Sequence, residues 1–298
     1  MNSVNTAFLG LGAIGRPMAS RIAAAGHQLT VWNRTAGRAE QFVRDNQAKS
    51  AATPADAVRG ADVIITCFST SADVEANLDG PAGIVAGLKE GAVLVDCTSG
   101  DPATSRAIAA RLASLGVSFL DAPVSGGVAG AEKGTLTVMV GGDAAVLERV
   151  RPVIDAFAGK VVHCGAVGAG DAIKAVNQAF LAIHLLAAGE GLVTLVKQGV
   201  DPKIALDVIN ASSGRSNSSM NLIPERVLTR AFPRTFRLAL LEKDIGIAAE
   251  LSRASRVPAP VTQLTADVFR IARGELGEQA DHVEIVKLVE QWAGAEIK

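Results

Sequence analysis

One lysine in the sequence has the residue type and the surroundings of a group that could move a proton. Lys174 follows a glycine-rich stretch, 165–170, and lies at the predicted start of a long apolar helix. A cation in the first turn of a helix opposes the helix dipole, and apolar surroundings disfavour it further, so both effects favour the neutral amine. Asn177 and Gln178, three and four residues further on, should share its face of the helix. The pattern favours acid–base chemistry at Lys174, and a solvated surface lysine is the alternative.

A second segment, Asp121–Gly127 (DAPVSGG), offers groups that could hold an anion. Its last three residues are a serine followed by two glycines, and such a turn exposes a hydroxyl and successive backbone N–H groups. This nest would suit the carboxylate of a small substrate, and a wide loop between two strands is the alternative. The predicted anion-binding residues are Ser125, Gly126 and Gly127.

Near the N-terminus the sequence GLGAIG (10–15) directly follows a predicted strand, Val4–Leu9, and opens a predicted helix, Gly15–Ala25. Its glycines permit a tight turn and a close approach of the backbone to a pyrophosphate, which the helix N-terminus then stabilises. A glycine-rich turn is the alternative, but the order of strand, loop, helix and second strand favours dinucleotide binding. The predicted cofactor contacts in this loop are Gly10, Gly12, Ala13, Ile14 and Gly15.

The residues after the second predicted strand bear on which dinucleotide is bound. An NAD-selective site usually has Asp or Glu here, which accepts a hydrogen bond from the ribose 2′-hydroxyl. This chain has Asn33, Arg34 and Thr35 instead. The guanidinium of Arg34 can pair with a 2′-phosphate, and its two neighbours can donate hydrogen bonds to it. We therefore predict NADP(H) as the favoured cofactor, with NAD(H) as the alternative; a solvated loop arginine is the other interpretation.

Two further segments follow the fourth and fifth predicted strands, at the edge where ligands of doubly wound sheets bind. The first is Thr66–Ser69 (TCFS) and the second is Asp96–Ser99 (DCTS). The candidate cofactor contacts in the first are Cys67, Phe68 and Ser69. Either segment alone is also typical of an ordinary turn from strand to helix. The cysteines in them are more typical of small buried hydrophobic residues than of reactive thiols.

The elements that would position these residues alternate through the first 164 residues. Short apolar runs, typical of strands buried on both faces, are separated by helical patterns, which predicts an α/β fold with a doubly wound, mostly parallel sheet. The further predicted strands are Leu29–Trp32, Asp62–Thr66, Ala92–Val95, Ser118–Leu120, Thr135–Val140 and Lys160–His163. The further predicted helices are Ala36–Asp45, Pro54–Arg59, Pro102–Leu115 and Asp143–Phe157.

From residue 165 the strand pattern stops and only helical patterns follow. We therefore predict a Rossmann-type NADP-binding domain at 1–164 and an all-α domain for substrate binding and dimerisation at 165–298. Lys243 and Asp244 fall on or beside an apolar helical stripe, which predicts either a structural ion pair or a ligand contact. The predicted helices are Asp171–Lys197, Met220–Arg230, Thr235–Arg256, Val261–Arg273 and Gln279–Ala293, and Asp201-Pro202 is typical of a further helix start.

The composition argues against several function classes. The 298 residues carry 29 Lys and Arg against 30 Asp and Glu, a net charge of −1, so no nucleic-acid partner is expected. Three cysteines without a Cys-x-x-Cys spacing give no disulfide framework, and no metal is predicted. The N-terminus has no targeting pattern and no 18-residue run is free of polar residues, so we expect a cytoplasmic protein without a membrane span. Abundant apolar surface on the longest helix predicts a homodimer or homotetramer.

Taken together, these motifs resemble the β-hydroxyacid dehydrogenase family, the group of 3-hydroxyisobutyrate dehydrogenase, tartronate semialdehyde reductase and, more distantly, 6-phosphogluconate dehydrogenase. The likeness spans nearly the whole chain, with motifs in family order at 10–19, 121–127, 168–177 and 236–244. It implies that Lys174 is the catalytic lysine and that the segment 33–35 is similar to the NADP-preferring branch. It implies substrate contacts for Ser125, Gly126, Gly127 and Asn177, and cofactor contacts for Ser99 and Lys243.

Three departures from the family pattern leave the substrate open. Gln178 stands where the family commonly has a second asparagine, which bears on the shape of the substrate pocket. Phe68 and Ser69 replace a Leu-Pro pair, and a Ser-Thr pair is inverted as Thr98 and Ser99, which keeps a hydroxyl at each place.

The resemblance implies an NAD(P)-dependent oxidoreductase of the 3-hydroxyisobutyrate dehydrogenase type. Such an enzyme would transfer a hydride between a nicotinamide cofactor and a small β-hydroxy acid or its semialdehyde, with Lys174 as general acid and base. Two alternatives stay open. One is a non-catalytic NADP-binding sensor or scaffold, which would not need the lysine, and the other is an imine reductase, which typically replaces it.

Overall fold

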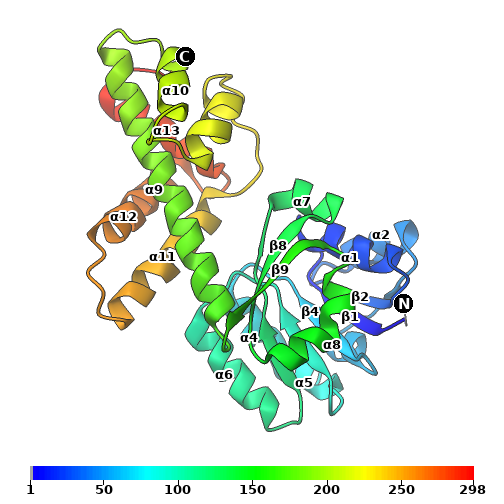
Figure 1. Cartoon of the computed structure of the whole chain (residues 1–298). Helices are drawn as coiled ribbons and strands as arrows, with labels where there is room; N and C mark the ends of the chain where they lie inside the picture. Colours follow the sequence, from blue (N-terminus) through cyan, green and yellow to red (C-terminus); the bar gives the residue numbers. More distant parts are fainter. Residues whose placement is uncertain (1–2) are drawn as a thin grey trace. The chain divides into compact units, whose positions relative to one another are not determined.

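The computed structural model describes residues 3–298 and consists of two compact units. The first unit ends at Lys174, and the second spans Ala175–Lys298. The predicted domain boundary, 164/165, falls at the end of the last strand, whereas the two units divide inside the long helix that follows it. Figure 1 shows the strands gathered in the first unit and helices alone in the second.

The first unit contains a nine-stranded sheet of order β3-β2-β1-β4-β5-β6-β8-β7, with β9 paired to β8 (Figure 1). The first six strands pair in parallel, and β8 is antiparallel to β6 and β7 but parallel to β9. Because β1 pairs with β2 on one side and β4 on the other, the strand order reverses there, and ligands bind at the carboxyl ends beside such a reversal. The strands are β1 (Asn5–Leu9), β2 (Gln28–Trp32), β3 (Lys49–Ser50), β4 (Val63–Thr66), β5 (Val93–Asp96), β6 (Ser118–Asp121), β7 (Val124–Ser125), β8 (Leu136–Gly141) and β9 (Ala158–Gly165).

Alternate residues of the central strands pack on opposite faces of the sheet. Phe8 and Val95 belong to one hydrophobic cluster, and Leu9 and Leu94 belong to another. Helices α1, α2, α7 and α8 contribute to the first cluster and helices α3 to α6 to the second. Burial on both faces explains why these strands are continuously apolar in sequence, and it confirms the predicted α/β class. The helices are α1 (Gly15–Ala24), α2 (Ala36–Asp45), α3 (Pro54–Val58), α4 (Ser71–Leu78), α5 (Ile84–Gly87), α6 (Pro102–Ala113), α7 (Gly127–Lys133) and α8 (Ala144–Ile154).

The second unit is built only from helices, as the sequence predicts, and Asp201 caps one of them with Pro202 at its first position. The predicted helix Met220–Arg230 is a π-helix that begins two residues earlier, at Ser218, and encloses Pro224, which has no N–H to donate. The helices are α9 (Ala169–Lys197), which begins in the first unit, α10 (Pro202–Asn210), the π-helix (Ser218–Val227), α11 (Leu238–Ala254), α12 (Pro260–Leu276), a short 3₁₀ helix (His282–Glu284) and α13 (Ile285–Ala293).

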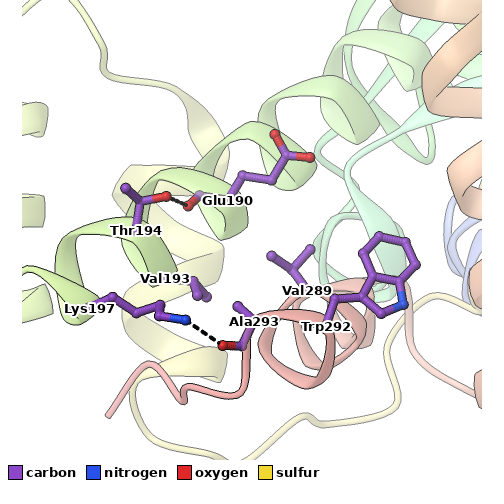
Figure 2. A pocket seen from close by; sticks show the side chains of 7 residues that line it. All are labelled: Glu190, Val193, Thr194, Lys197, Val289, Trp292 and Ala293. Carbon is purple, nitrogen blue, oxygen red and sulfur yellow. Dashed lines mark hydrogen bonds between the residues drawn. The ribbon is translucent and has the colours of Figure 1, made fainter.

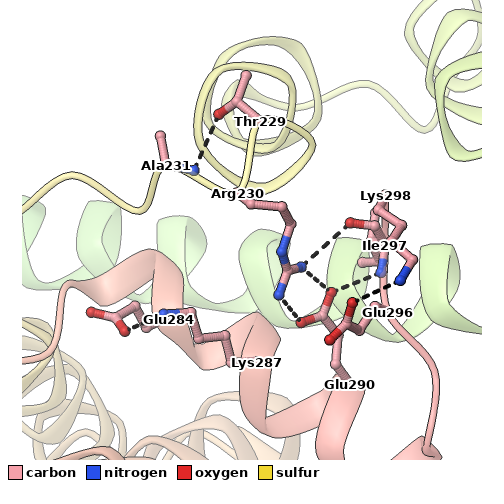
Figure 3. Close-up of polar contacts among 9 residues, drawn as sticks. All are labelled: Thr229, Arg230, Ala231, Glu284, Lys287, Glu290, Glu296, Ile297 and Lys298. Carbon is pink, nitrogen blue, oxygen red and sulfur yellow. Dashed lines mark hydrogen bonds and ion pairs between the residues drawn. The ribbon is translucent and has the colours of Figure 1, made fainter.

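The end of the chain is held to this helical core by a partly buried ion pair (Figure 3). The two terminal nitrogens of Arg230 donate to the two carboxylate oxygens of Glu290 at 2.5 and 3.0 Å. Glu290 also accepts a hydrogen bond of 2.7 Å from the backbone N–H of Ile297, whose side chain is fully buried. A bidentate guanidinium and a backbone donor together compensate the burial of this carboxylate.

Among residues 3–298, α9 is the one helix long and apolar enough to cross a membrane by length and composition. Its most apolar 18-residue window has a mean hydropathy of 1.9, and 39% of that window is buried. The same test is passed by long helices of helical domains, and α9 carries charged and amide side chains at Lys174, Gln178 and Glu190. The expectation of no membrane span therefore stays a prediction.

Candidate active site

The glycine loop after β1 is shaped by two contacts that exclude side chains. Gly10 has a φ of +104°, and a Cβ there would collide with the carbonyl oxygen of Cys67 at the end of β4. A Cβ at Gly15 would collide with the carbonyl oxygen of Gly10. At Gly12, by contrast, no described atom outside its own neighbours lies within 4 Å of the Cβ position. The loop thus packs tightly on the sheet and leaves open space at its middle glycine, which fits the approach of a pyrophosphate.

Helix α1 starts without a side-chain cap of its own. Ile14 occupies the N-cap position, and the first turn holds no acidic residue. Backbone N–H groups at such a helix start are available to a phosphate, and the helix dipole stabilises it. The predicted dinucleotide loop therefore has the geometry and the electrostatics that a pyrophosphate requires.

The residues after β2 divide between a structural and a solvent-facing role. Asn33 accepts a hydrogen bond of 2.9 Å from the backbone N–H of Leu11 and donates one of 3.0 Å to the carbonyl of Thr35. Its amide therefore ties the glycine loop to the end of β2. The side chain of Arg34 is 88% exposed, and its guanidinium lies 3.7 Å from Asp73, a weak ion pair in water. Its charge is available to a ligand at this edge of the sheet.

The ends of β4 and β5 are fastened to each other by a buried carboxylate. Asp96 accepts hydrogen bonds from the Thr66 hydroxyl at 2.8 Å and from the backbone N–H of Thr98 at 3.0 Å. The Thr98 hydroxyl in turn accepts a hydrogen bond of 3.0 Å from the backbone N–H of Phe68. Burial raises the pKa of Asp96 to about 6, although the two threonine contacts lower it. These contacts bring the predicted segments 67–69 and 97–99 side by side.

Of the two cysteines in these segments, Cys97 is buried as the sequence predicts, and Cys67 is only partly buried by its exposure. Burial raises the pKa of the Cys67 thiol to about 12. A thiol with so high a pKa stays protonated near neutral pH and is a poor nucleophile. Cys67 instead supplies the carbonyl oxygen against which Gly10 packs.

The start of α9 is locked by two buried aspartates. Asp121, at the end of β6, accepts hydrogen bonds from the backbone N–H groups of Gly168 at 2.7 Å and Asp171 at 3.0 Å. The Asp171 carboxylate accepts hydrogen bonds from the Ser105 hydroxyl at 2.6 Å and the backbone N–H of Gly100 at 3.2 Å. The first turn of α9 is therefore fixed to the segments that follow β5 and β6.

The long helix begins earlier than the sequence predicts, which corrects the expected position of the lysine. Because α9 starts at Ala169 and not at Asp171, Lys174 lies in its second turn, where the opposing effect of the dipole is weaker. Burial is therefore a stronger feature of the Lys174 environment than the helix dipole, because this residue is only 7% exposed. Gln178 is also buried, whereas Asn177 is exposed. The amide that shares the buried face of Lys174 is thus Gln178, since residues four apart lie on one side of a helix.

The Ser-Gly-Gly segment has a short strand and a helix start, and not the wide loop that was the alternative to an anion-binding nest. Ser125 ends β7, Gly126 is the N-cap of α7 with a φ of +135°, and Gly127 is its first residue. Both glycines are exposed. Sequence reasoning missed α7 because its seven residues include two glycines, which disfavour helix.

In the second unit, Lys243 and Asp244 lie in the second turn of α11. Their side chains form an ion pair of 2.9 Å between Nζ and Oδ1, and Asp244 is buried. The interpretation as an ion pair is therefore confirmed, and the predicted cofactor contact of Lys243 stays a prediction. Sequence reasoning missed Asp121 and Asp171 as anchors, because their partners lie 47 or more residues away along the chain.

Two hollows in the second unit lie along the C-terminal half of α9. One, of about 270 Å³, lies against α13 and is lined by Val193, Lys197 and Trp292 among others (Figure 2). The other, of about 400 Å³, includes His184 and the loop residues 213–216. Neither contains a residue predicted to bind substrate or cofactor. The candidate site is therefore identified by the loops at the carboxyl ends of the strands and not by the volume of a hollow.

Comparison with known proteins covers nearly the whole chain. Residues 5–165 match the model for the NAD-binding domain of 6-phosphogluconate dehydrogenase, and residues 168–289 match the model for the NAD-binding region of NADP-dependent 3-hydroxyisobutyrate dehydrogenase. The 2-(hydroxymethyl)glutarate dehydrogenase of Eubacterium barkeri is 33% identical to this chain. The alignment covers 99% of this chain and 98% of that protein. The 2-hydroxy-3-oxopropionate reductase of Escherichia coli is 34% identical over 96% of this chain and 97% of its own.

Solved structures agree with these relatives. A 3-hydroxyisobutyrate dehydrogenase of Mycobacterium tuberculosis with L-serine has a TM-score of 0.89, at 30% identity over 97% of this chain and 99% of its own. The structure of Psf3 in complex with NADP+ and 2-OPP has a TM-score of 0.84, at 27% identity over 95% of this chain and 99% of its own.

A glycine loop at the switch point of a Rossmann-type sheet, followed by a helical unit, defines a nicotinamide-dinucleotide-dependent oxidoreductase. The chain belongs to the β-hydroxyacid dehydrogenase family, the 3-hydroxyisobutyrate dehydrogenase group within the 6-phosphogluconate dehydrogenase superfamily.

Proposed function

We propose that this oxidoreductase prefers NADP(H) and interconverts a small β-hydroxy acid and its semialdehyde, with Lys174 as general acid and base. The observation that carries the proposal is the placement of this amine. Lys174 is 7% exposed, on a helix whose first turn is hydrogen-bonded to the segments after β5 and β6. Burial shields the amine from bulk water, and a fixed helix start holds it in one place, which suits a proton-transfer group.

When bound, the nicotinamide ring supplies the hydride in reduction and accepts it in oxidation. In reduction, the Lys174 ammonium donates a proton to the carbonyl oxygen of the semialdehyde. In oxidation, the neutral amine accepts the proton of the substrate hydroxyl. Asn177, which the resemblance places among the substrate contacts, would hold the same oxygen from the next turn of α9.

The substrate carboxylate would bind at Ser125, Gly126 and Gly127. The exposed N–H groups at the start of α7 and the Ser125 hydroxyl are suitable donors, and the positive end of a helix dipole favours an anion. Fixing the carboxylate would set the position of the reacting carbon, and such positioning is a large part of rate enhancement.

The exposed guanidinium of Arg34 supports the preference for NADP(H). It stands where an NAD-selective site has a carboxylate, and its weak contact with Asp73 leaves its charge available to a 2′-phosphate. Gly10, Gly12, Ala13, Ile14 and Gly15 would hold the pyrophosphate. Ser69, Ser99 and the segment Cys67–Phe68 would line the nicotinamide side, and Lys243 would contact the cofactor from α11.

The decisive experiment is a spectrophotometric screen of small semialdehydes with NADPH and NADH side by side. Succinic, tartronic, methylmalonic and sulfonated semialdehydes span the chemistry that the carboxylate nest would accept. We expect oxidation of NADPH at 340 nm with at least one of them, and slower oxidation of NADH. Binding of NADPH without turnover of any semialdehyde would favour the sensor or scaffold, and turnover of a cyclic imine instead would favour the imine reductase.

We also propose that the chain forms a homodimer or homotetramer through α9. Ile173, Val176 and Phe180 are 46, 43 and 57% exposed and recur at helical spacing, so they form an apolar stripe on this helix. Trp292, which is 57% exposed, lines the hollow between α9 and α13 (Figure 2) and is a further exposed apolar side chain in this unit. Sedimentation at micromolar concentration should give a dimer or tetramer, and a monomer that persists at those concentrations would contradict the proposal.

A further inference from the structure

A chain of contacts in the second unit joins two residues whose predicted roles differ. The side-chain N–H₂ group of Asn177 donates to Gln178 Oε1 at 3.3 Å, and Gln178 Nε2 donates to Asp244 Oδ2 at 2.9 Å. Asp244 Oδ1 lies 2.9 Å from Nζ of Lys243. The predicted substrate contact, Asn177, is thereby connected to the predicted cofactor contact, Lys243, through Gln178 and Asp244.

Burial makes the two middle members of this chain the ones that set its geometry. Gln178 is 5% exposed and Asp244 is 3% exposed, whereas the side chain of Lys243 is 22% exposed. A buried carboxylate is unfavourable unless it is hydrogen-bonded or paired with a charge. Gln178 donates a hydrogen bond to Oδ2, and Lys243 places its charge beside Oδ1, which accepts no hydrogen bond from the described residues, so the position of Asp244 depends on both.

The charge of Asp244 also decides which way the Gln178 amide faces. A carboxylate accepts hydrogen bonds and cannot donate them, so the N–H₂ group of Gln178 must face it. The carbonyl oxygen of Gln178 must then face a donor, and the donor it meets is the N–H₂ group of Asn177. The orientation of the exposed amide at 177 thus follows from a charge on another helix.

We propose that Gln178 is a positioning residue, which fixes Lys243 through Asp244 and orients the amide of Asn177. This inference rests on the proposed function, because that function assigns cofactor and substrate contacts to these two residues. An asparagine at 178 would be one methylene shorter and could not reach both partners from the same helical position. The two contacts of Gln178 therefore explain why this position suits a glutamine better than an asparagine.

The test exchanges the polarity of the central hydrogen bond in the full-length protein. Gln178→Glu keeps the size of the side chain but sets two buried carboxylates against each other. Asp244→Asn in addition would restore the chain, because its N–H₂ group can donate to the carboxylate at 178 while its oxygen faces Lys243. The matched control is Gln198→Glu, the same change at an exposed site just beyond the end of α9.

Positioning is measured by the Kd for NADPH, from fluorescence quenching, and by kcat and KM for the semialdehyde found in the screen. Stability is measured separately by the Tm. For Q178E we expect about a 10- to 100-fold loss in NADPH affinity and in kcat/KM, as is typical when a hydrogen bond to a buried charge is lost. The double variant Q178E/D244N should recover to within about 5-fold of the unchanged protein, and Q198E should match it.

Three results would overturn the proposal. One is a Q178E variant that binds NADPH and turns over substrate as the unchanged protein does. Another is a double variant that recovers the Tm but not the Kd or KM, which would show a purely structural role. If Q178E does not fold, Gln178→Asn serves in its place, and an unchanged Kd for NADPH in that variant would be the third. Because the Kd needs no turnover, the inference can fail or stand even if no semialdehyde is a substrate.

Discussion

Two buried aspartates, one in each unit, differ in how their negative charge is compensated. Asp171 lies in the first turn of the helix that carries Lys174, and Asp281 precedes the short helix before α13. Both are nearly inaccessible, at 2% and 1% exposed. Burial raises the pKa of Asp171 to about 7, whereas Asp281 has a pKa well below its ordinary range. The contrast shows that burial alone does not decide how a carboxyl group titrates.

The neighbours of the two carboxylates account for the difference. Around Asp171, burial and the carboxylates of Asp121 and Asp96 raise the pKa, and the Ser105 hydroxyl lowers it only in part. Around Asp281, burial also raises the pKa, but the His282 ring at 2.9 Å and several backbone N–H groups outweigh it. The group around Asp171, the first centre, therefore has a raised pKa, and the group around Asp281, the second centre, has a lowered one. We expect changes in the first centre to alter activity and pH dependence, and changes in the second to alter stability.

The largest effect is expected at the first centre. Lys174→Ala should lower kcat by about 10²–10⁴-fold, the usual worth of a general acid or base, while NADPH affinity changes little. Lys174→Met, which keeps most of the side-chain volume, separates lost chemistry from a cavity. Lys203→Ala, at an exposed site on α10, is the control. Initial rates at saturating substrate give kcat, and a kcat that either Lys174 variant retains would remove this residue from the mechanism.

Changes at the second centre, around Asp281, should lower the stability of the protein. Asp281 accepts hydrogen bonds from the backbone N–H groups of Thr235, Phe236 and Val283, at 2.7, 2.9 and 3.1 Å. Asp281→Ala leaves these buried or partly buried donors unpaired, so the free energy of unfolding in urea should fall by about 2–4 kcal/mol. Asp267→Asn, in an exposed ion pair, should change it by less than about 0.5 kcal/mol. Equal losses in the two variants would contradict the distinction.

The same contrast shows what the sequence could predict. Strand–helix alternation, the glycine loop after β1 and the Asp201-Pro202 helix start depend on neighbours in sequence, and the structure confirms each. The contacts of Asp121 and Asp171 join residues 47 to 71 apart, and no local pattern encodes them.

The side chains on α9 show a second limit. Spacing alone placed Asn177 and Gln178 on one face with Lys174, but the structure buries only Gln178 with the lysine. Which of two neighbouring residues is buried depends on what packs against the helix, and this is set by tertiary contacts and not by helical periodicity. Motifs could therefore predict candidate site residues, but they could not predict the residues that anchor them, because anchoring depends on tertiary contacts.

A pH titration of stability would sharpen the comparison further. Because the pKa of Asp171 is raised from 3.8 to about 7, its folded form holds a proton that the unfolded chain has already lost. Its contribution to stability is therefore complete below pH 4 and is lost as the pH rises to 7, at up to about 1.4 kcal/mol per pH unit.

Asp171→Asn removes that titration. The unchanged protein should lose stability relative to D171N between pH 4 and 7, and the difference should level off above pH 7. Asp96, with a pKa raised to about 6, titrates in both proteins, and its charge adds to the rise in the pKa of Asp171 that the difference reports. Urea unfolding at each pH gives the free energies. A difference that stays constant across this range would show that Asp171 is ionised in the folded protein.

The smallest effects come from removing one hydroxyl donor from each centre. Ser105→Ala deletes the 2.6 Å hydrogen bond to Asp171, and Thr235→Val deletes the 3.0 Å hydrogen bond from the Thr235 hydroxyl to Asp281. Asp171 loses a main stabiliser of its charged form, so S105A should cost about 1.5–3 kcal/mol at pH 8 and less at pH 4.5, where Asp171 is largely neutral. Asp281 keeps its backbone donors and stays ionised across this range, so T235V should cost about 0.5–1 kcal/mol at both pH values. A pH-independent loss in S105A, or a larger loss in T235V, would show that the two carboxylates are compensated alike.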